Sequence, residues 1–346
     1  MNLEKVAVVG ASGYSGEELV RLLSRHPGVE IVALTSRQSA GQTLREVYPK
    51  FAGTRYSELP FIDSNIDAII AAGAGFVFLA LPHGVAAEFA RPLIAAGSRV
   101  LDLSADFRIK DPVSHGEFYG EPPHAPELAA LSIYGLPEVY RDRIRGAQLV
   151  ACPGCYPTSI ILPLHPLLKQ RLLDPQSIVV SSMSGVSGAG RNAKTDYLFA
   201  ECNESVRAYS VPKHRHLAEI EQELSYAHGE PLRISFTPHL VPATRGIHTT
   251  IYATPTPDVA PADIDAALRD AYALEPFVRV LGTTGVLPDT KHVTHTNFID
   301  IAWRHDARTR RLVLLSAEDN LVKGAAGQAV QCFNAMCGWP ETTALL

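Results

Sequence analysis

The sequence predicts an α/β domain with a parallel sheet, followed by an α+β domain with a mixed, largely antiparallel sheet. Three observations carry this prediction. The chain has 346 residues, more than one hydrophobic core usually organises. Its first half alternates short apolar runs with helix-like segments, which is typical of a parallel sheet covered on both faces. From Gln148 onward, strand-like runs follow one another with few helices between them, which is typical of an α+β domain.

The composition is that of a compact folded chain without a strong charge. Hydrophobic residues make up 46% and charged residues 19% of the chain, and 31 Lys and Arg stand against 36 Asp and Glu, a net charge of −5. Disordered proteins combine low hydrophobicity with high net charge, and binding to nucleic acid or an anionic membrane draws on positive charge. These classes of protein are therefore excluded, and an anionic ligand has to be held by a local group of side chains.

No segment has the pattern of an export signal or a membrane span. The first residues carry charges and glycines where a secretory signal has an apolar core. The longest apolar stretch, Ala68 to Leu81, is shorter than the ~20 residues of a membrane-spanning helix. Five cysteines are too few, and odd in number, for a disulfide framework. We therefore expect a cytoplasmic protein with reduced thiols and with neither a nucleic-acid nor a membrane partner.

Apolar periodicity places the elements of the first half. Residues 5–10 form an apolar, β-branched run closed by glycine, and residues 16–23 follow with helical spacing. Glycine and proline punctuation then separates the next runs. Further strands are expected at 29–34, 76–81 and 99–103, with a helix at 85–96.

The second half begins with a strand at 149–151, which leads into an apolar helix through Leu168. Pro163 and Pro166 predict kinks in that helix. The segment 319–337 is expected to be helical and to pack on the first domain. Other helices are expected at 217–227 and 262–273, and strands at 178–183, 233–237, 246–254, 277–281, 297–303 and 311–316.

A glycine-rich segment, 10–16, lies between the first strand and the first helix. Glycines allow close backbone approach, and the helix start offers unpaired N–H groups to a pyrophosphate. The spacing G-x-x-G-x-x-G is a variant of the usual dinucleotide fingerprint, and the alternative is an ordinary tight turn. The strand-turn-helix context favours a Rossmann-type dinucleotide site made by Gly10, Ser12, Gly13, Tyr14, Ser15 and Gly16.

The end of the second strand indicates which dinucleotide binds. NAD sites place a carboxylate there for the ribose 2′-hydroxyl, whereas NADP sites accommodate a 2′-phosphate, often with an arginine. Here Ser36 and Arg37 follow the strand, and no carboxylate is present. Arg37 could instead be an ordinary exposed arginine of a loop. The missing carboxylate and the arginine beside Ser36 nevertheless favour NADP over NAD.

Cys152-Pro-Gly-Cys155 admits three interpretations. A C-x-x-C pair before a helix is the thioredoxin arrangement of a redox dithiol. Half a zinc site would need Cys332 and Cys337, whose five-residue separation on a helix turns the two side chains apart, so no metal site is expected. The third interpretation is a single nucleophile, Cys155, at a helix start that favours the thiolate, with Cys152 as a buried structural thiol.

A thiolate nucleophile needs a proton donor and acceptor close to it in space. Lys213-His-Arg-His216 concentrates four basic groups immediately before a helix. This segment could supply the proton donor and acceptor, or it could be only a solvated group of basic residues at the start of that helix. The spacing alone leaves open whether His214 or His216 is the base.

Seven motifs together carry a family resemblance. The most specific are Leu103-Ser-Ala-Asp-Phe-Arg108, Cys152-Pro-Gly-Cys-Tyr-Pro-Thr158 and His214-Arg-His-Leu-Ala-Glu-Ile220, and the others span 10–16, 184–191, 236–242 and 319–324. In this order they resemble the N-acetyl-γ-glutamyl-phosphate reductases over nearly the whole chain. That family is similar to aspartate-semialdehyde dehydrogenase in fold and mechanism. Leu217-Ala218 stands where relatives often have a proline, a detail of the helix start.

The resemblance implies NADPH-dependent reduction of N-acetyl-γ-glutamyl phosphate to N-acetylglutamate 5-semialdehyde and phosphate, in arginine biosynthesis. It implies a thioester on Cys155, with His216 as general acid and base, and a homodimer or homotetramer. Arg108 matches a substrate-binding arginine, with His214, Arg191 and Arg245 as its neighbours. The residues implied to contact the nicotinamide or close over the nucleotide are Ser187, Gly188, Asn320, Pro82 and His83.

The same motifs divide the chain into two predicted domains. Residues 1–150 and 320–346 are expected to bind NADP, and residues 151–319 to form the catalytic and dimerisation domain. LysW-aminoadipyl-phosphate reductase is a similar alternative, but its acidic carrier would need a basic surface that this chain lacks. An NADP-sensing protein without catalysis or a thiol-disulfide oxidoreductase are alternatives of other classes. An NADP-sensing protein without catalysis would have lost Cys155, which is present here. The redox activity of a thiol-disulfide oxidoreductase would depend on Cys152 as much as on Cys155.

Overall fold

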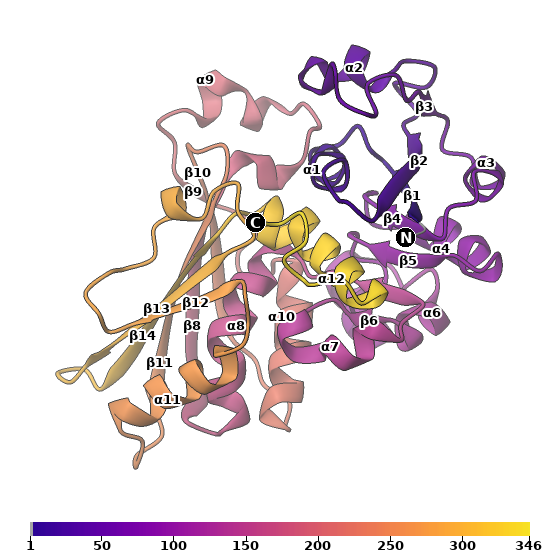
Figure 1. Ribbon diagram of the computed structural model, residues 1–346. Coiled ribbons are helices and arrows are strands. Elements are labelled where there is room, and N and C mark those ends of the chain that lie inside the picture. Colours follow the sequence, from indigo (N-terminus) through magenta and orange to yellow (C-terminus); the bar gives the residue numbers. More distant parts are fainter. Residues whose placement is uncertain (1–2) are drawn as a thin grey trace. The chain divides into compact units, whose positions relative to one another are not determined.

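The computed structural model describes residues 3–346, which group into two compact units, each built on its own sheet (Figure 1). Unit 1 runs to Pro112, resumes over Glu121–Pro153 and ends with Ala325–Leu346, and unit 2 consists of Val113–Gly120 and Gly154–Gly324. These limits lie a few residues from those of the predicted domains, except that Val113–Gly120 group with unit 2. The division of function between the domains stays a prediction.

Unit 1 contains a seven-stranded sheet in the order β3-β2-β1-β4-β5-β7-β6, and every neighbouring pair is parallel. Its central strands are apolar and buried on both faces, which is the pattern that a covered parallel sheet requires. The α/β class predicted from the sequence is confirmed. The strands are β1 (Glu4–Val9), β2 (Val29–Thr35), β3 (Phe61–Ile62), β4 (Phe76–Leu79), β5 (Arg99–Asp102), β6 (Ile133–Tyr134) and β7 (Leu149–Ala151).

Two groups of helices pack in unit 1. One consists of α1 (Tyr14–Leu23), α7 (Pro137–Arg145) and α12 (Gly327–Cys337), and the other contains α3 (Ile66–Ala71) and α4 (Ala86–Ala95). The shorter helices are α2 (Leu44–Val47) and α6 (Pro126–Leu131). Every residue of α12 from Gly327 to Met336 is buried, so the end of the chain completes this core, as expected.

Unit 2 contains a mixed seven-stranded sheet in the order β12-β13-β14-β11-β8-β10-β9. Strands β8 and β10 pair in parallel, as do β12 and β13, and the other four pairings are antiparallel. The predicted mixed, largely antiparallel sheet is therefore confirmed. The strands are β8 (Leu173–Gly185), β9 (Arg207–Ala208), β10 (Ser235–Val241), β11 (Ile247–Pro255), β12 (Val278–Gly282), β13 (Ile299–Asp306) and β14 (Arg311–Glu318).

Helix α8 (Cys155–Lys169) packs on this sheet and runs through both Pro163 and Pro166. It contacts β8, β11 and β14, together with helices α10 (His216–His228) and α11 (Pro261–Tyr272). Strand residues alternate between buried and more exposed positions, as expected for a sheet with one covered face. Two further helices of this unit are α5 (Pro112–Tyr119) and α9 (Phe199–Cys202).

The predicted helix at 319–337 has a more complex form. A turn follows β14, Val322–Ala326 form a π-helical turn, and α12 begins only at Gly327. π-Helical turns are rare and are often found at functional sites. Across residues 3–346, no helix combines the length and the apolar character that crossing a membrane requires.

Candidate active site

The glycine-rich segment of unit 1 forms a backbone cradle after β1. Gly10 has φ of 80°, and a Cβ there would lie 2.4 Å from the carbonyl oxygen of Ala80. A Cβ on Gly16 would lie 2.3 Å from the carbonyl oxygen of Gly10. Helix α1 begins after Gly13 without a side-chain cap, so its first N–H groups point toward the cradle. This close-packed turn, with glycines at positions 10, 13 and 16 and a helix start behind it, fits the pyrophosphate of a dinucleotide.

The structure brings two predicted cofactor residues of unit 1 together. The Ser36 hydroxyl donates to Oγ of Ser12 at 2.8 Å, and the Tyr48 hydroxyl donates to the carbonyl oxygen of Ser12 at 2.8 Å. Arg37 follows Ser36 and is exposed, with no carboxylate paired to it among the described residues. A buried hydroxyl and an exposed guanidinium thus lie next to each other at the end of β2, and a role of both in binding the ribose stays a prediction. Tyr14 and Ser15 occupy the first positions of α1.

The segment after β5 forms hydrogen bonds to the backbone of neighbouring loops in unit 1 through Asp106 and Arg108. The Asp106 carboxylate accepts the N–H groups of Gly84 and Ala87, which anchors the turn of Pro82 and His83 ahead of α4. Arg108 is 5% exposed, and its guanidinium donates to the carbonyl oxygens of Cys152 and Leu103 at 2.7 and 2.8 Å. The structure therefore gives Arg108 a backbone-holding role, and substrate binding by it stays a prediction.

Cys155 occupies the first position of α8 in unit 2. It is half-buried, whereas Cys152 of unit 1 is fully buried, and neither forms a disulfide. A Cβ on Gly324 would lie 2.8 Å from Cβ of Cys155, so the turn after β14 packs closely on the cysteine. A helix start stabilises a thiolate through its N–H groups and dipole. The position of Cys155 therefore suits a nucleophile.

His216 and Glu219 face the same residue, Gly154, from the first turn of α10. A Cβ on Gly154 would lie 2.6 Å from Nε2 of His216 and 2.8 Å from Oε1 of Glu219, and Oε2 of Glu219 accepts the N–H of Gly154 at 3.2 Å. Residues three apart on a helix share a face. His216 therefore lies beside the start of the helix that carries Cys155, and Glu219, which no motif singles out as a candidate, lies with it against Gly154.

His214 has a different environment from His216. Its Nδ1 accepts the backbone N–H of His216 at 3.1 Å, so it satisfies an N–H group at the start of α10. Burial, with a smaller effect from Arg215, lowers the pKa of His214 to about 4. Its ring lies edge-on to those of Tyr156 and Phe236, 5.5 and 5.7 Å away. His214 is therefore neutral near pH 7 and supports the position of His216.

The two other basic groups of the motif turn toward α5. Lys213 pairs with Glu117 at 2.9 Å, and its Nζ lies 5.0 Å from the ring centre of Phe118. The guanidinium of Arg215 lies 5.8 Å from the ring centre of Tyr119. The segment thus alternates between two histidines whose rings lie beside Tyr156 and two exposed cations that contact α5.

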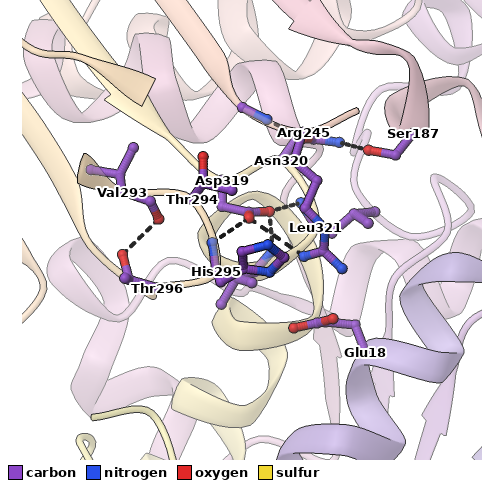
Figure 2. Close-up of polar contacts among 12 residues, drawn as sticks. Glu18, Ser187, Arg245, Val293, Thr294, His295, Thr296, Asp319, Asn320 and Leu321 are labelled. Carbon is purple, nitrogen blue, oxygen red and sulfur yellow. Dashed lines mark hydrogen bonds and ion pairs between the residues drawn. The ribbon is translucent and has the colours of Figure 1, made fainter. Parts of the chain in front are cut away.

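A second polar cluster of unit 2 lies at the turn after β14 (Figure 2). Nδ2 of Asn320 donates to Oγ of Ser187 at 3.0 Å, and Oδ1 of Asn320 accepts the N–H of Gly246 at 2.8 Å. Asp319 lies 3.4 Å from Nη1 of Arg245. The structure thus joins Asn320 to Ser187 and places Arg245 in the same cluster. Gly188 and Arg191 follow Ser187 and are exposed.

Among residues 3–346, no three His, Cys, Asp or Glu side chains gather as a metal site would require. Burial, with a contribution from the negative charge of Asp106, raises the pKa of Asp102 in unit 1 to about 7. This carboxyl lies at the end of β5, below the Ser104 hydroxyl that donates to it at 2.7 Å.

Comparison with known proteins places the chain in a family. Residues 5–147 match the family described as "Semialdehyde dehydrogenase, NAD binding domain", and residues 155–320 match "Semialdehyde dehydrogenase, dimerisation domain". A protein of Akkermansia muciniphila named N-acetyl-gamma-glutamyl-phosphate reductase is 56% identical over 345 residues, which cover 100% of this chain and 99% of that protein. A protein of the same name from Citrifermentans bemidjiense is 52% identical over 99% of this chain and 97% of its own length.

Solved structures agree on the fold. Aspartate semialdehyde dehydrogenase II from Vibrio cholerae, complexed with ASA, superposes with a TM-score of 0.72 at 17% identity, over 98% of this chain and 99% of that one. Aspartate semialdehyde dehydrogenase with NADP from Candida albicans superposes with a TM-score of 0.69 at 17% identity, over 97% of this chain and 99% of that one. The identities to the named reductases are far higher than these. The chain therefore belongs to the N-acetyl-γ-glutamyl-phosphate reductases, within the semialdehyde dehydrogenase family.

Proposed function

We propose that this protein reduces N-acetyl-γ-glutamyl phosphate to N-acetylglutamate 5-semialdehyde and phosphate with NADPH, a step of arginine biosynthesis. The observation that carries the proposal is the start of α8 in unit 2, where Cys155 follows Gly154 and His216 lies against that glycine. The relatives of this chain are named N-acetyl-gamma-glutamyl-phosphate reductase, and this supports N-acetyl-γ-glutamyl phosphate as the substrate. None of the five cysteines in the described residues forms a disulfide, which suits a reducing cytoplasm, in which a catalytic thiol persists.

Cys155 performs the covalent step in this proposal. Its thiolate sulfur attacks the acyl carbon, the bond from that carbon to the phosphate oxygen breaks, and inorganic phosphate leaves a thioester behind. The helix start at Cys155 favours negative charge on the tetrahedral oxyanion, and an N–H donor to such an oxyanion is typically worth about 3 kcal/mol. Splitting the reaction through a covalent intermediate replaces one difficult step by two accessible ones.

His216 moves the proton. As imidazolium it stabilises the thiolate, and it then protonates the oxygen of the thiohemiacetal formed by reduction of the thioester. In the reverse direction it removes that proton. The carboxylate of Glu219 holds the N–H of Gly154 and thereby fixes the residue that separates His216 from Cys155. Arg108, His214, Arg191 and Arg245 remain our candidates for substrate binding.

The cradle of unit 1 supports nicotinamide dinucleotide binding. The candidates for holding the cofactor are the residues of segment 10–16, Ser36, Arg37, Pro82 and His83 in unit 1, with Ser187, Gly188 and Asn320 in unit 2. When bound, the reduced cofactor supplies the hydride. We favour NADP because an exposed arginine follows β2 where an NAD site would carry a carboxylate.

Replacing Arg37 by glutamate tests this preference. A carboxylate repels the 2′-phosphate of NADPH, whereas it can accept the 2′-hydroxyl of NADH. We expect the Arg37→Glu variant to bind NADPH at least tenfold more weakly and NADH about as well as the wild type. Fluorescence titration with both cofactors measures the two affinities, and Arg45→Glu is a matched exposed control on α2. An unchanged ratio of the NADPH and NADH affinities would show that Arg37 does not bind the 2′-phosphate.

We further propose that the chain forms a homodimer or homotetramer through the uncovered face of the unit 2 sheet. Val179, Met183 and Tyr252 are 43%, 46% and 41% exposed there. Val179 pairs with Tyr252 across β8 and β11, which makes part of this face continuous and apolar.

Charges on this face should separate the subunits. The double variant Met183→Lys/Tyr252→Lys would have to bury two unpaired charges in the interface. We expect light scattering to give a multiple of the chain mass for the wild type and a lower mass for the variant. An unchanged mass would place the interface elsewhere, and the exposed Val113→Lys substitution serves as control.

A further inference from the structure

A buried carboxylate, Asp319, joins parts of unit 2 that the proposed function uses separately (Figure 2). Its Oδ1 accepts the N–H groups of Leu321 and Val322 at 2.8 and 3.1 Å. Its Oδ2 accepts the N–H of His295 at 2.7 Å and lies 3.4 Å from Nη1 of Arg245. The Asp319 side chain is fully buried, so these donors replace water around the carboxylate and fix its direction.

The main chain of Asp319 fixes the turn that packs on Cys155. Its carbonyl oxygen accepts the N–H of Gly324 at 2.9 Å, a bond across five residues that leads into the π-helical turn. Gly324 is the residue whose missing side chain allows contact with Cβ of Cys155. The same residue therefore anchors the guanidinium of Arg245 and the backbone facing the nucleophile.

The backbone at His295 is consistent with a strong anchor. His295 has φ of 67°, in the left-handed region that a residue with a side chain rarely occupies because it is strained there. Such a conformation persists where the surroundings impose it. The bond from its N–H to Asp319 is one such constraint, and it brings the loop before β13 to the carboxylate.

We propose that Asp319 is a positioning residue that acts through Arg245, aiming the guanidinium at an anionic group of the substrate. This inference rests on the proposed function, in which Arg245 binds substrate. The Arg245 side chain is 17% exposed, so part of it remains accessible while Asp319 holds it from the buried side. A fixed guanidinium binds an anion with less loss of side-chain freedom than a mobile one.

A double-mutant cycle on the full chain tests the inference. Asp319→Asn keeps one oxygen for Leu321 and Val322 but turns an amide NH₂ toward the donors of Arg245 and His295. In phosphate-dependent oxidation of the semialdehyde, we expect Arg245→Ala to raise KM for one of the two anionic substrates. Asp319→Asn should raise the same KM about tenfold and change kcat less than threefold, and the double variant should match Arg245→Ala within about twofold.

Other outcomes overturn the inference. Independent effects that multiply in the double variant, or a loss of kcat with unchanged KM, would mean that Asp319 does not act through Arg245. Asp300→Asn is the matched control, because Asp300 is also buried and paired with an arginine, Arg279, and it should lower the melting temperature without changing KM. If Asp319→Asn does not fold, Asp319→Glu replaces it in the double-mutant cycle with Arg245→Ala. Glutamate keeps the negative charge but moves it to a different position. An inactive wild type would refute the proposed function, whereas an active wild type with an unaffected Asp319 variant would refute only this inference.

Discussion

Replacing Cys155 by serine is expected to abolish phosphate-dependent NADPH formation from N-acetylglutamate 5-semialdehyde, with a loss of ~10⁴-fold in kcat/KM. A serine hydroxyl at the start of α8 stays protonated where a thiol ionises, and its ester would be a poorer acyl donor than the thioester. Serine is close to cysteine in volume, so the fold should be retained. Initial rates followed by NADPH absorbance, together with the melting temperature, measure both effects.

Cys152→Ser is the matched control for this experiment. Cys152 is fully buried after β7 in unit 1, and its replacement should leave most of the activity. Equal losses in the two variants would indicate a dithiol mechanism in place of a single nucleophile. Mass spectrometry after a single turnover should detect the acyl group on Cys155 in the wild type and in the Cys152 variant.

Replacing His216 by glutamine is expected to lower the rate by ~10²- to 10⁴-fold, the usual contribution of a positioned acid or base. In the oxidative direction the imidazole must be neutral to accept a proton, so the wild-type rate should fall as the pH drops. The variant should lose this acidic limb, because glutamine does not titrate. A pH–rate profile of kcat/KM that keeps the limb in His216→Gln would remove His216 from the proton transfer.

His214→Asn is the control for the histidine assignment. Asparagine retains a side-chain oxygen that can accept the N–H of His216, as Nδ1 of His214 does. Because burial lowers the pKa of His214 to about 4, an acidic limb above pH 5 does not come from this residue. The variant should therefore keep the limb and lose less than tenfold in rate.

The sequence predicts the five central strands of unit 1 and helices α1 and α4, because these segments have clean periodicity. It does not predict the short edge strands β3 and β6 or the helices α2, α3, α6 and α7. Strand β10 shows where such reasoning is less accurate. The strand was expected at 233–237, but it runs from Ser235 to Val241 and contains Pro238. Proline removes a donor and is tolerated near a sheet edge, and β9 pairs with β10 only at His239 and Leu240. The position of β10 in the sheet, which local sequence does not contain, decided its length.

The candidate site was predictable in its residue types but not in its geometry. The glycine spacing predicts the turn after β1, whereas the CPGC motif allows three interpretations, among which the family resemblance favours Cys155 as the nucleophile. The spacing leaves His214 and His216 open and the family resemblance implies His216, while the burial and hydrogen bond of His214, which only the fold supplies, support that assignment. Glu219 and Asp319 were missed because a single acidic residue near a helix or turn is ordinary in sequence. Their significance comes from Gly154 and Arg245, which lie 65 and 74 positions away along the chain.

The position of α12 has a consequence for biosynthesis. Unit 1 receives its first 112 residues early in translation, but the buried helix that fills its core belongs to the last segment, Ala325–Leu346. At typical rates of ~5–20 residues per second, the intervening segment from Gly154 to Gly324 takes roughly 10 to 30 s to synthesise. During that interval the nascent sheet exposes an apolar surface outside the ribosome, so chaperone protection at this stage would govern the yield of native protein.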